Sequence, residues 1–173
     1  DRETKRDISA ASFDRLVAFV EDVLPEIDAV LVSDYNKGLV TRDLMERVTA
    51  AACRHGKYVI VDPKGLDYSK YKGATLLTPN RKEASLAAGI DIGDDASLED
   101  AAHRIMTAVE LDKLLITLGK DGMALFEAGR PTYRIATRAR QVYDVSGAGD
   151  TVLSVLGLSL GLGASFQDST AMA

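Results

Sequence analysis

Asp-Val-Ser-Gly-Ala-Gly-Asp-Thr, residues 144–151, combines a glycine-rich turn with an acid at the start of an apolar run. Gly147 and Gly149 flank Ala148, Asp150 follows directly, and leucine and valine dominate the next ten positions. This pattern predicts a turn that leads into a buried helix. The first turn of a helix directs unpaired backbone N–H groups and the positive end of the dipole at one point, which suits an anion.

The position of Asp150 predicts more than phosphate binding. A carboxylate in the first turn would be out of place if the site only held phosphate. It is explained if Asp150 takes a proton from an attacking hydroxyl while the N–H groups of Gly147, Ala148 and Gly149 stabilise the transferred phosphoryl group. The alternative is a helix start whose acid only complements the dipole, because short glycine motifs also arise by chance.

Length and composition set the class of protein. The 173 residues fit one domain, residues 1–173, with a sizeable core. Hydrophobic residues make up 46% and charged residues 27%, which is typical of a soluble globular protein. The net charge of −5 argues against a nucleic-acid partner, because phosphate contacts need a basic face.

The single cysteine and the apolar runs address the cellular setting. Cys53 cannot form an intramolecular disulfide, so a reducing, cytoplasmic setting is expected. Cys53 follows three alanines and is expected to be a small core residue. The longest uncharged run, 151–166, is shorter than the ~20 apolar residues of a spanning helix, so no membrane partner is expected.

Helical and strand periodicities alternate along the chain. The spacing of apolar residues predicts helices over 8–24, 41–56, 80–88, 97–109 and 150–161. Short apolar runs predict strands at 29–32, 58–61, 75–77, 114–117, 123–126 and 140–143. Ser97 and Asp100 are expected to form a capping box at the start of their helix. The alternation predicts an α/β fold, an open and mostly parallel sheet with helices on both faces and an antiparallel edge.

A carboxamide and a carboxylate follow one of these strands. Asn80 and Glu83 are three residues apart and therefore share a face of a helix. Together they suit a hydrated Mg²⁺ beside phosphates, since Mg²⁺ keeps several waters and takes few protein ligands. Taken alone, the motif favours the alternative, a helix start with Asn80 as N-cap and Glu83 completing a capping box.

Other polar loops follow strands at the same edge of the sheet. Thr117 and Gly119 begin one loop, where glycine permits close backbone approach, although a plain hairpin turn explains it too. Asp34, Lys37 and Lys64 lie in two acid-then-lysine loops and are candidate phosphate or substrate contacts. For these loops, two polar turns are the alternative.

Several motifs carry a family resemblance. Residues 144–151 resemble the D-T-x-G-A-G-D signature of the ribokinase/PfkB carbohydrate kinases, residues 80–83 their N-x-x-E motif, and residues 117–122 their T-L-G-x-x-G element. Ser-Asp-Tyr-Asn-Lys-Gly at 33–38 and Val-Asp-Pro-Lys-Gly at 61–65 narrow the resemblance to the heptose-7-phosphate kinase domains of bifunctional ADP-heptose synthases. The match runs from about residue 28 to residue 161.

The resemblance implies a ribokinase-like fold, ATP and Mg²⁺ as cofactors, and a sugar phosphate as substrate. Asp150 would be the general base, with Gly147 to Gly149 as the anion hole. Asn80 and Glu83 would organise Mg²⁺ through water, and Asn80, Thr117 and Gly119 would contact the nucleotide.

The resemblance is to part of such a domain. The family's glycine-pair motif, sugar-binding residues and small β lid have no counterpart here, so a partial domain with little activity of its own is expected. An exposed sheet edge would favour homo-oligomers. The alternatives are a kinase for ribose, fructose or a nucleoside, and a nucleotide-binding module without catalysis.

Overall fold

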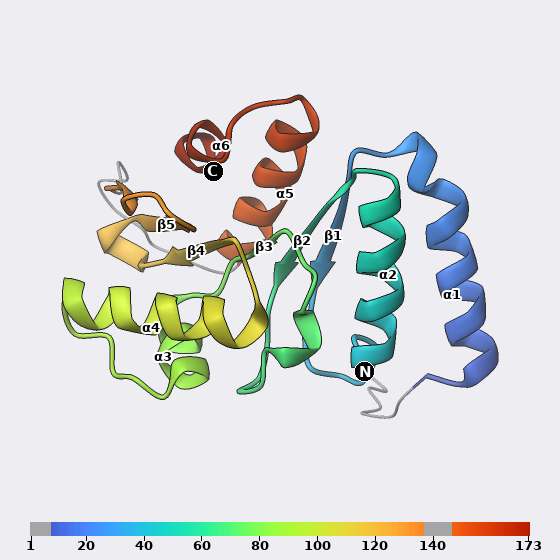
Figure 1. Ribbon diagram of the computed structural model, residues 1–173, viewed down its shortest axis with the longest axis horizontal. Helices are drawn as coiled ribbons and strands as arrows, with labels where there is room; N and C mark the ends of the chain where they lie inside the picture. Colours follow the sequence, from blue (N-terminus) through green and yellow to red (C-terminus); the bar gives the residue numbers. More distant parts are fainter. Residues whose placement is uncertain (1–7, 137–146) are drawn as a thin grey trace.

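One six-stranded sheet organises the computed structural model, which describes residues 8–136 and 147–173 (Figure 1). The strands are β1 (Ala29–Ser33), β2 (Tyr58–Asp62), β3 (Leu76–Leu77), β4 (Lys113–Thr117), β5 (Met123–Glu127) and β6 (Tyr133–Ile135), and they lie in that order across the sheet. β1 to β4 are parallel, whereas β5 and β6 are antiparallel to their neighbours. The predicted parallel sheet with an antiparallel edge is confirmed. The strand predicted at 140–143 lies outside the described residues.

Helices cover both faces of the sheet (Figure 1). They are α1 (Ala10–Val23), α2 (Arg42–Arg54), α3 (Arg81–Ala88), α4 (Asp95–Val109), α5 (Ala148–Gly161) and α6 (Phe166–Met172), with short 3₁₀ turns η1 (Leu24–Glu26), η2 (Ser69–Tyr71) and η3 (Gly119–Asp121). Apolar residues of α2, α3 and α4 form one core with the sheet, and those of α5 form the other. α1 packs on α2, outside these layers.

The middle of β2 shows why a continuous apolar run forms this strand. Val59 and Val61 belong to the core under α2, α3 and α4, and Ile60 belongs to the core under α5. Successive side chains of a strand point to opposite faces, so a strand with both faces covered needs apolar residues at every position. All three side chains are buried.

The start of α4 differs from the prediction. Ser97 was expected to cap this helix with Asp100, but Asp94 is the N-cap. The Asp94 carboxylate accepts the Ser97 N–H at 2.8 Å, and the Ser97 hydroxyl accepts the Asp94 N–H at 3.0 Å. Ser97 therefore closes the capping box from its third position, because an earlier acid satisfies the same three-residue spacing.

Cys53 is also placed differently from the expectation. It is exposed, because Ala51 and Ala52 of α2 are the buried residues and Cys53 lies about 100° further around the helix, away from the core. Over residues 8–136 and 147–173, the helices are too short or too polar to cross a membrane.

Close packing places α5 against the first two strands. A Cβ atom added at Gly157 would lie 2.6 Å from Leu31 Cδ2, so only a glycine lets the helix approach β1 this closely without displacing that side chain. This approach brings the first turn of α5 to the carboxyl ends of β1 and β2.

Candidate active site

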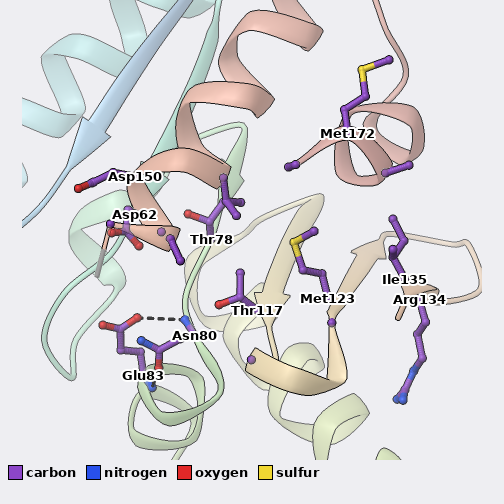
Figure 2. A pocket seen from close by; sticks show the side chains of 18 of the residues that line it. Asp62, Thr78, Asn80, Glu83, Thr117, Met123, Arg134, Ile135, Asp150 and Met172 are labelled. Carbon is purple, nitrogen blue, oxygen red and sulfur yellow. Dashed lines mark hydrogen bonds between the residues drawn. The ribbon is translucent and has the colours of Figure 1, made fainter. Parts of the chain in front are cut away.

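A cavity of about 1250 Å³ opens at the carboxyl ends of the parallel strands (Figure 2). Asp62 ends β2, Thr78 follows β3, and Thr117 ends β4, so these side chains reach the same edge of the sheet. The start of α5 closes the cavity from the other face. Ligands of open α/β sheets bind at this edge.

The start of α5 contributes backbone groups to the cavity. Gly147 is the N-cap residue in the left-handed region, with φ of 80°, and it lines the cavity together with Ala148 and Gly149. Among the described residues, no side chain caps this helix, whereas α1, α2, α3, α4 and α6 each have a side-chain cap. The first N–H groups of α5 are therefore available to an anion.

Asp150 is the third residue of α5 and faces the same cavity. One carboxylate oxygen accepts from the Ser33 hydroxyl at 3.2 Å, and the other accepts from the Tyr35 hydroxyl at 3.3 Å. The loop after β1 thereby orients an exposed carboxylate. This arrangement suits a group that accepts a proton from a bound hydroxyl.

Asn80 and Glu83 form a capping box at the start of α3. The Asn80 side chain accepts the Glu83 N–H, and Glu83 Oε2 accepts the Asn80 N–H, both at 3.0 Å. Glu83 Oε1 accepts from the Lys64 ammonium group. Figure 2 shows both residues of the box at the cavity, so the geometry of the capping alternative is present at the position proposed for the metal.

Asp62 is a site residue that the sequence analysis passed over. Its pKa is raised from 3.8 to about 6, by burial first and by the nearby Glu83 carboxylate second, while Lys64 acts in the opposite direction. A Cβ atom added at Gly149 would lie 3.7 Å from Asp62 Oδ2, which places this carboxylate beneath the start of α5. Asp62 belongs to the same acid-then-lysine loop that pointed to Lys64, and both residues line the cavity.

The residues present fit a divalent cation accompanied by phosphates. Asp62, Glu83 and Asp150 lie along one side of the cavity in Figure 2, and the pKa of Asp62 is raised by burial first and by these neighbouring acids in addition. In the part of the chain that the structure describes, no three His, Cys, Asp or Glu side chains lie close enough to hold a metal ion. A cation here would therefore depend on water and phosphate oxygens, as Mg²⁺ commonly does.

The opposite side of the cavity is more apolar. Met123, Ile135 and Met172 lie there in Figure 2, beyond Thr117. Gly119, at φ of 63°, opens the turn between β4 and β5 and also lines the cavity. An apolar side next to a polar, acidic side suits a ligand that has a flat ring at one end and phosphates at the other.

The structure does not bring all candidate residues to the cavity. Lys64 lines it, but Asp34 is buried, with 3% of its surface exposed, and accepts from Lys70 Nζ at 2.5 Å and from the Tyr71 hydroxyl at 2.6 Å. Asp34 thus lies behind the residues that line the cavity. Lys37 lies outside the cavity lining, with its ammonium 5.8 Å from the ring centroid of Tyr35.

Known proteins share both the sequence and the fold. The model of the pfkB carbohydrate kinase family matches residues 3–173. The bifunctional protein HldE of Desulfatibacillum aliphaticivorans is 55% identical over 173 residues, and that of Trichlorobacter lovleyi is 48% identical over 173 residues. Each alignment covers 100% of this chain and 35% of the relative, so the chain spans 35% of the length of these relatives.

Two solved structures are similar in fold. Arabidopsis thaliana ribokinase, complexed with ribose and ATP, has a TM-score of 0.75 at 22% identity, over 95% of this chain and 50% of that one. The tetrameric inhibited form of Escherichia coli phosphofructokinase-2 has a TM-score of 0.76 at 20% identity, over 95% of this chain and 54% of that one. At these identities the likeness shows the fold, which is ribokinase-like as predicted.

Proposed function

Because this chain belongs to the pfkB family of carbohydrate kinases, we propose that it transfers the terminal phosphoryl group of ATP to a sugar hydroxyl. The observation that carries the proposal is the start of α5, where uncapped N–H groups and the Asp150 carboxylate face one cavity. These features serve phosphoryl transfer, since one holds the transferred group and the other accepts the proton. In this proposal residues 1–173 are part of one kinase domain.

Each group at the cavity has a role in the proposed reaction. Asp150 accepts the proton of the attacking hydroxyl, and the Ser33 and Tyr35 hydroxyls keep its carboxylate turned toward the substrate. The N–H groups at the start of α5 stabilise the charge that builds up on the transferred phosphoryl oxygens. Thr117 and Gly119 contact the nucleotide beside the apolar side of the cavity.

Mg²⁺, when bound, neutralises charge on the phosphates and so favours transfer. Asn80 and Glu83 would hold it through water, and Asp62 adds a carboxylate beside them. The capping box fixes the Glu83 side chain at the helix start, so the acid is in position before the cation arrives.

The proposed substrate is heptose 7-phosphate, with heptose 1,7-bisphosphate as the product used for ADP-heptose and lipopolysaccharide core precursors. The support is the high identity to proteins named HldE together with the loop motifs at 33–38 and 61–65. Lys64, exposed at the cavity, is the candidate contact for a phosphate. The single cysteine and the use of ATP favour a cytoplasmic reaction.

Asp150→Asn in the full-length protein tests the proposal. Loss of the general base should lower turnover by about 10²–10⁴-fold or more, while ATP binding persists, because the backbone N–H groups are unchanged. The measurement is ADP release with heptose 7-phosphate, beside calorimetric ATP binding. Asp43→Asn is the matched control, since Asp43 is an exposed acid in the first turn of α2 and should leave turnover unaltered.

The same assay separates the alternatives. Turnover of Asp150→Asn within a few-fold of the parent would refute the role of Asp150. A faster reaction with ribose, fructose or a nucleoside than with heptose 7-phosphate would support a kinase function but exclude heptose 7-phosphate as the main substrate. ATP binding with no phosphorylated product from any of these sugars would identify a nucleotide-binding module.

A further inference from the structure

Lys64 and Glu83 form an ion pair inside the cavity. The Lys64 side chain is 47% exposed and the Glu83 side chain 14% exposed, so the lysine reaches in from the rim to a largely covered acid. Glu83 Oε2 already accepts the Asn80 N–H at 3.0 Å, and Oε1 accepts from the Lys64 ammonium. Both oxygens of the proposed metal-organising residue therefore have a partner within the protein.

A metal-bound water and the Lys64 ammonium need the same oxygen. Oε2 is committed to the start of α3, and releasing it would cost the helix its cap. Oε1 is the oxygen that can change partners, because an ion pair with a half-exposed lysine is weak and easily exchanged. Oε1 can accept a second hydrogen bond, but the ammonium charge repels a cation placed beside it, so the ion pair and the proposed Mg²⁺ contact compete at this oxygen.

We propose that Lys64 is an internal counter-ion, which occupies the place of Mg²⁺ at Glu83 and releases the acid when the metal binds. This inference rests on the proposed function. Lys64 then turns to the phosphates that arrive with the metal, so its positive charge stays in the cavity. Its role is to set how strongly the free protein binds a divalent cation, and to keep Asp62 and Glu83 from repelling each other before that.

The surroundings of Lys64 allow such an exchange. Its backbone N–H donates to the Tyr71 hydroxyl at 2.9 Å, and that hydroxyl also donates to the buried Asp34 at 2.6 Å. The backbone of the loop is thus anchored, while four methylene groups let the ammonium move. Asp34, which the sequence suggested as a substrate contact, supports the exchange from behind.

Manganese binding without nucleotide tests the inference on the full-length protein. Free Mn²⁺ is measured by electron paramagnetic resonance for the parent, Lys64→Met, Lys64→Arg, Glu83→Gln and the double variant Lys64→Met/Glu83→Gln. Removing the competing ammonium should tighten Mn²⁺ binding by about tenfold. Lys64→Arg keeps the charge and should stay within about threefold of the parent. The control is Lys82→Met, which removes an exposed positive charge next to Glu83 in sequence and should have little effect.

The double variant decides whether Glu83 is the shared partner. The tightening caused by Lys64→Met should vanish when Glu83 is already Gln, because the exchange then has no acid to act on. Unchanged or weaker Mn²⁺ binding in Lys64→Met would overturn the inference. So would a tightening that persists in the Glu83→Gln background or that Lys82→Met reproduces.

A parallel sugar-dependent ADP assay keeps the two proposals apart. Sugar phosphorylation by the parent, together with no change of Mn²⁺ affinity in Lys64→Met, would support the kinase function and refute the counter-ion role of Lys64. The expected change in Mn²⁺ affinity without phosphorylation of any sugar would support the counter-ion role of Lys64 and refute the kinase function.

Discussion

At the scale of single residues, Asp62 carries the strongest electrostatic signal in the site. Its carboxylate lies between the start of α5 and Glu83, and burial and that neighbour hold its pKa at about 6 instead of 3.8. In the unfolded chain this group is ionised from about pH 4 upward. Between about pH 4 and pH 6, the folded protein therefore keeps a proton on Asp62 that the unfolded chain has lost.

This difference in pKa gives the stability a defined dependence on pH. Because the folded pKa is the higher one, the stability contributed by Asp62 is present below pH 3.8 and is lost as the pH rises through about 6. Asp62→Asn removes the ionisation, so the variant should not lose this stability as the pH rises. At pH 7 its free energy of unfolding should exceed that of the parent by about 1 kcal/mol, after allowance for solvent screening.

Urea unfolding of both proteins between pH 4 and 8, without divalent cations, measures the difference. Asp121→Asn serves as control, since Asp121 is an exposed acid paired with Arg81. A stability difference that stays constant across this pH range would show that Asp62 ionises normally.

The sequence predicted much of the site at this scale because its motifs are local. Asn80, Glu83 and Thr117 lie at or after the ends of β3 and β4, and they line one cavity together with Asp150 at the start of α5. The raised pKa of Asp62 could not be deduced in this way, since the burial of its carboxylate and the approach of Glu83 arise only when distant elements pack together.

At the scale of elements, the turn between β4 and β5 shapes one side of the cavity. Gly122 directly follows η3, with φ of 89°, and packs against β6, where an added Cβ atom would lie 1.8 Å from the Ile135 carbonyl oxygen. That atom belongs to the backbone and cannot move aside without breaking the pairing of β5 and β6.

Gly122→Ala should therefore destabilise the protein by at least about 3 kcal/mol, by collision and by the left-handed backbone. Gly129→Ala is the matched control in the next turn, between β5 and β6, with φ of 73° and nothing within 4 Å of the added atom. It should cost only about 1–2 kcal/mol. Thermal unfolding of the two variants compares them, and equal losses would show that the collision is relieved.

Element boundaries were predictable where one capping residue stood alone. Thr41 and Asn80 begin their helices as expected. The predicted start of α4 was wrong because Asp94 and Ser97 both satisfy capping rules, and only the folded backbone selects between them. The predicted burial of Cys53 was wrong for a related reason, since a run of small residues does not show where the buried face of a helix ends.

At the scale of the whole molecule, β1 forms one edge of the sheet and is only partly covered. Leu31 on this strand is 41% exposed, Leu158 on α5 is 69% exposed, and Leu162, directly after α5, is 81% exposed. Exposed apolar side chains near an open strand edge favour association with another copy. The sequence indicated the strands, but the alternation alone could not show which strand lies at the edge.

We expect the variant Leu158→Lys/Leu162→Lys to associate less than the parent chain of 173 residues. Sedimentation velocity over a range of concentrations measures this, with Leu86→Lys as control, because Leu86 is an exposed leucine on α3. A monomeric parent, or equal association of parent and double variant, would contradict the expectation.

Each strand of the sheet pairs with the next one in the chain, so the sheet can assemble in the order in which the ribosome releases it. α5 leaves the ribosome after the six strands that the described residues form, and it returns to cover β1 and β2. A nascent chain that has emerged as far as β6 already holds Asn80 and Thr117 but not Asp150. Translation itself thus delays the proposed chemistry, because the proposed nucleotide contacts are made first and the proposed proton acceptor comes into place only when α5 has cleared the exit tunnel.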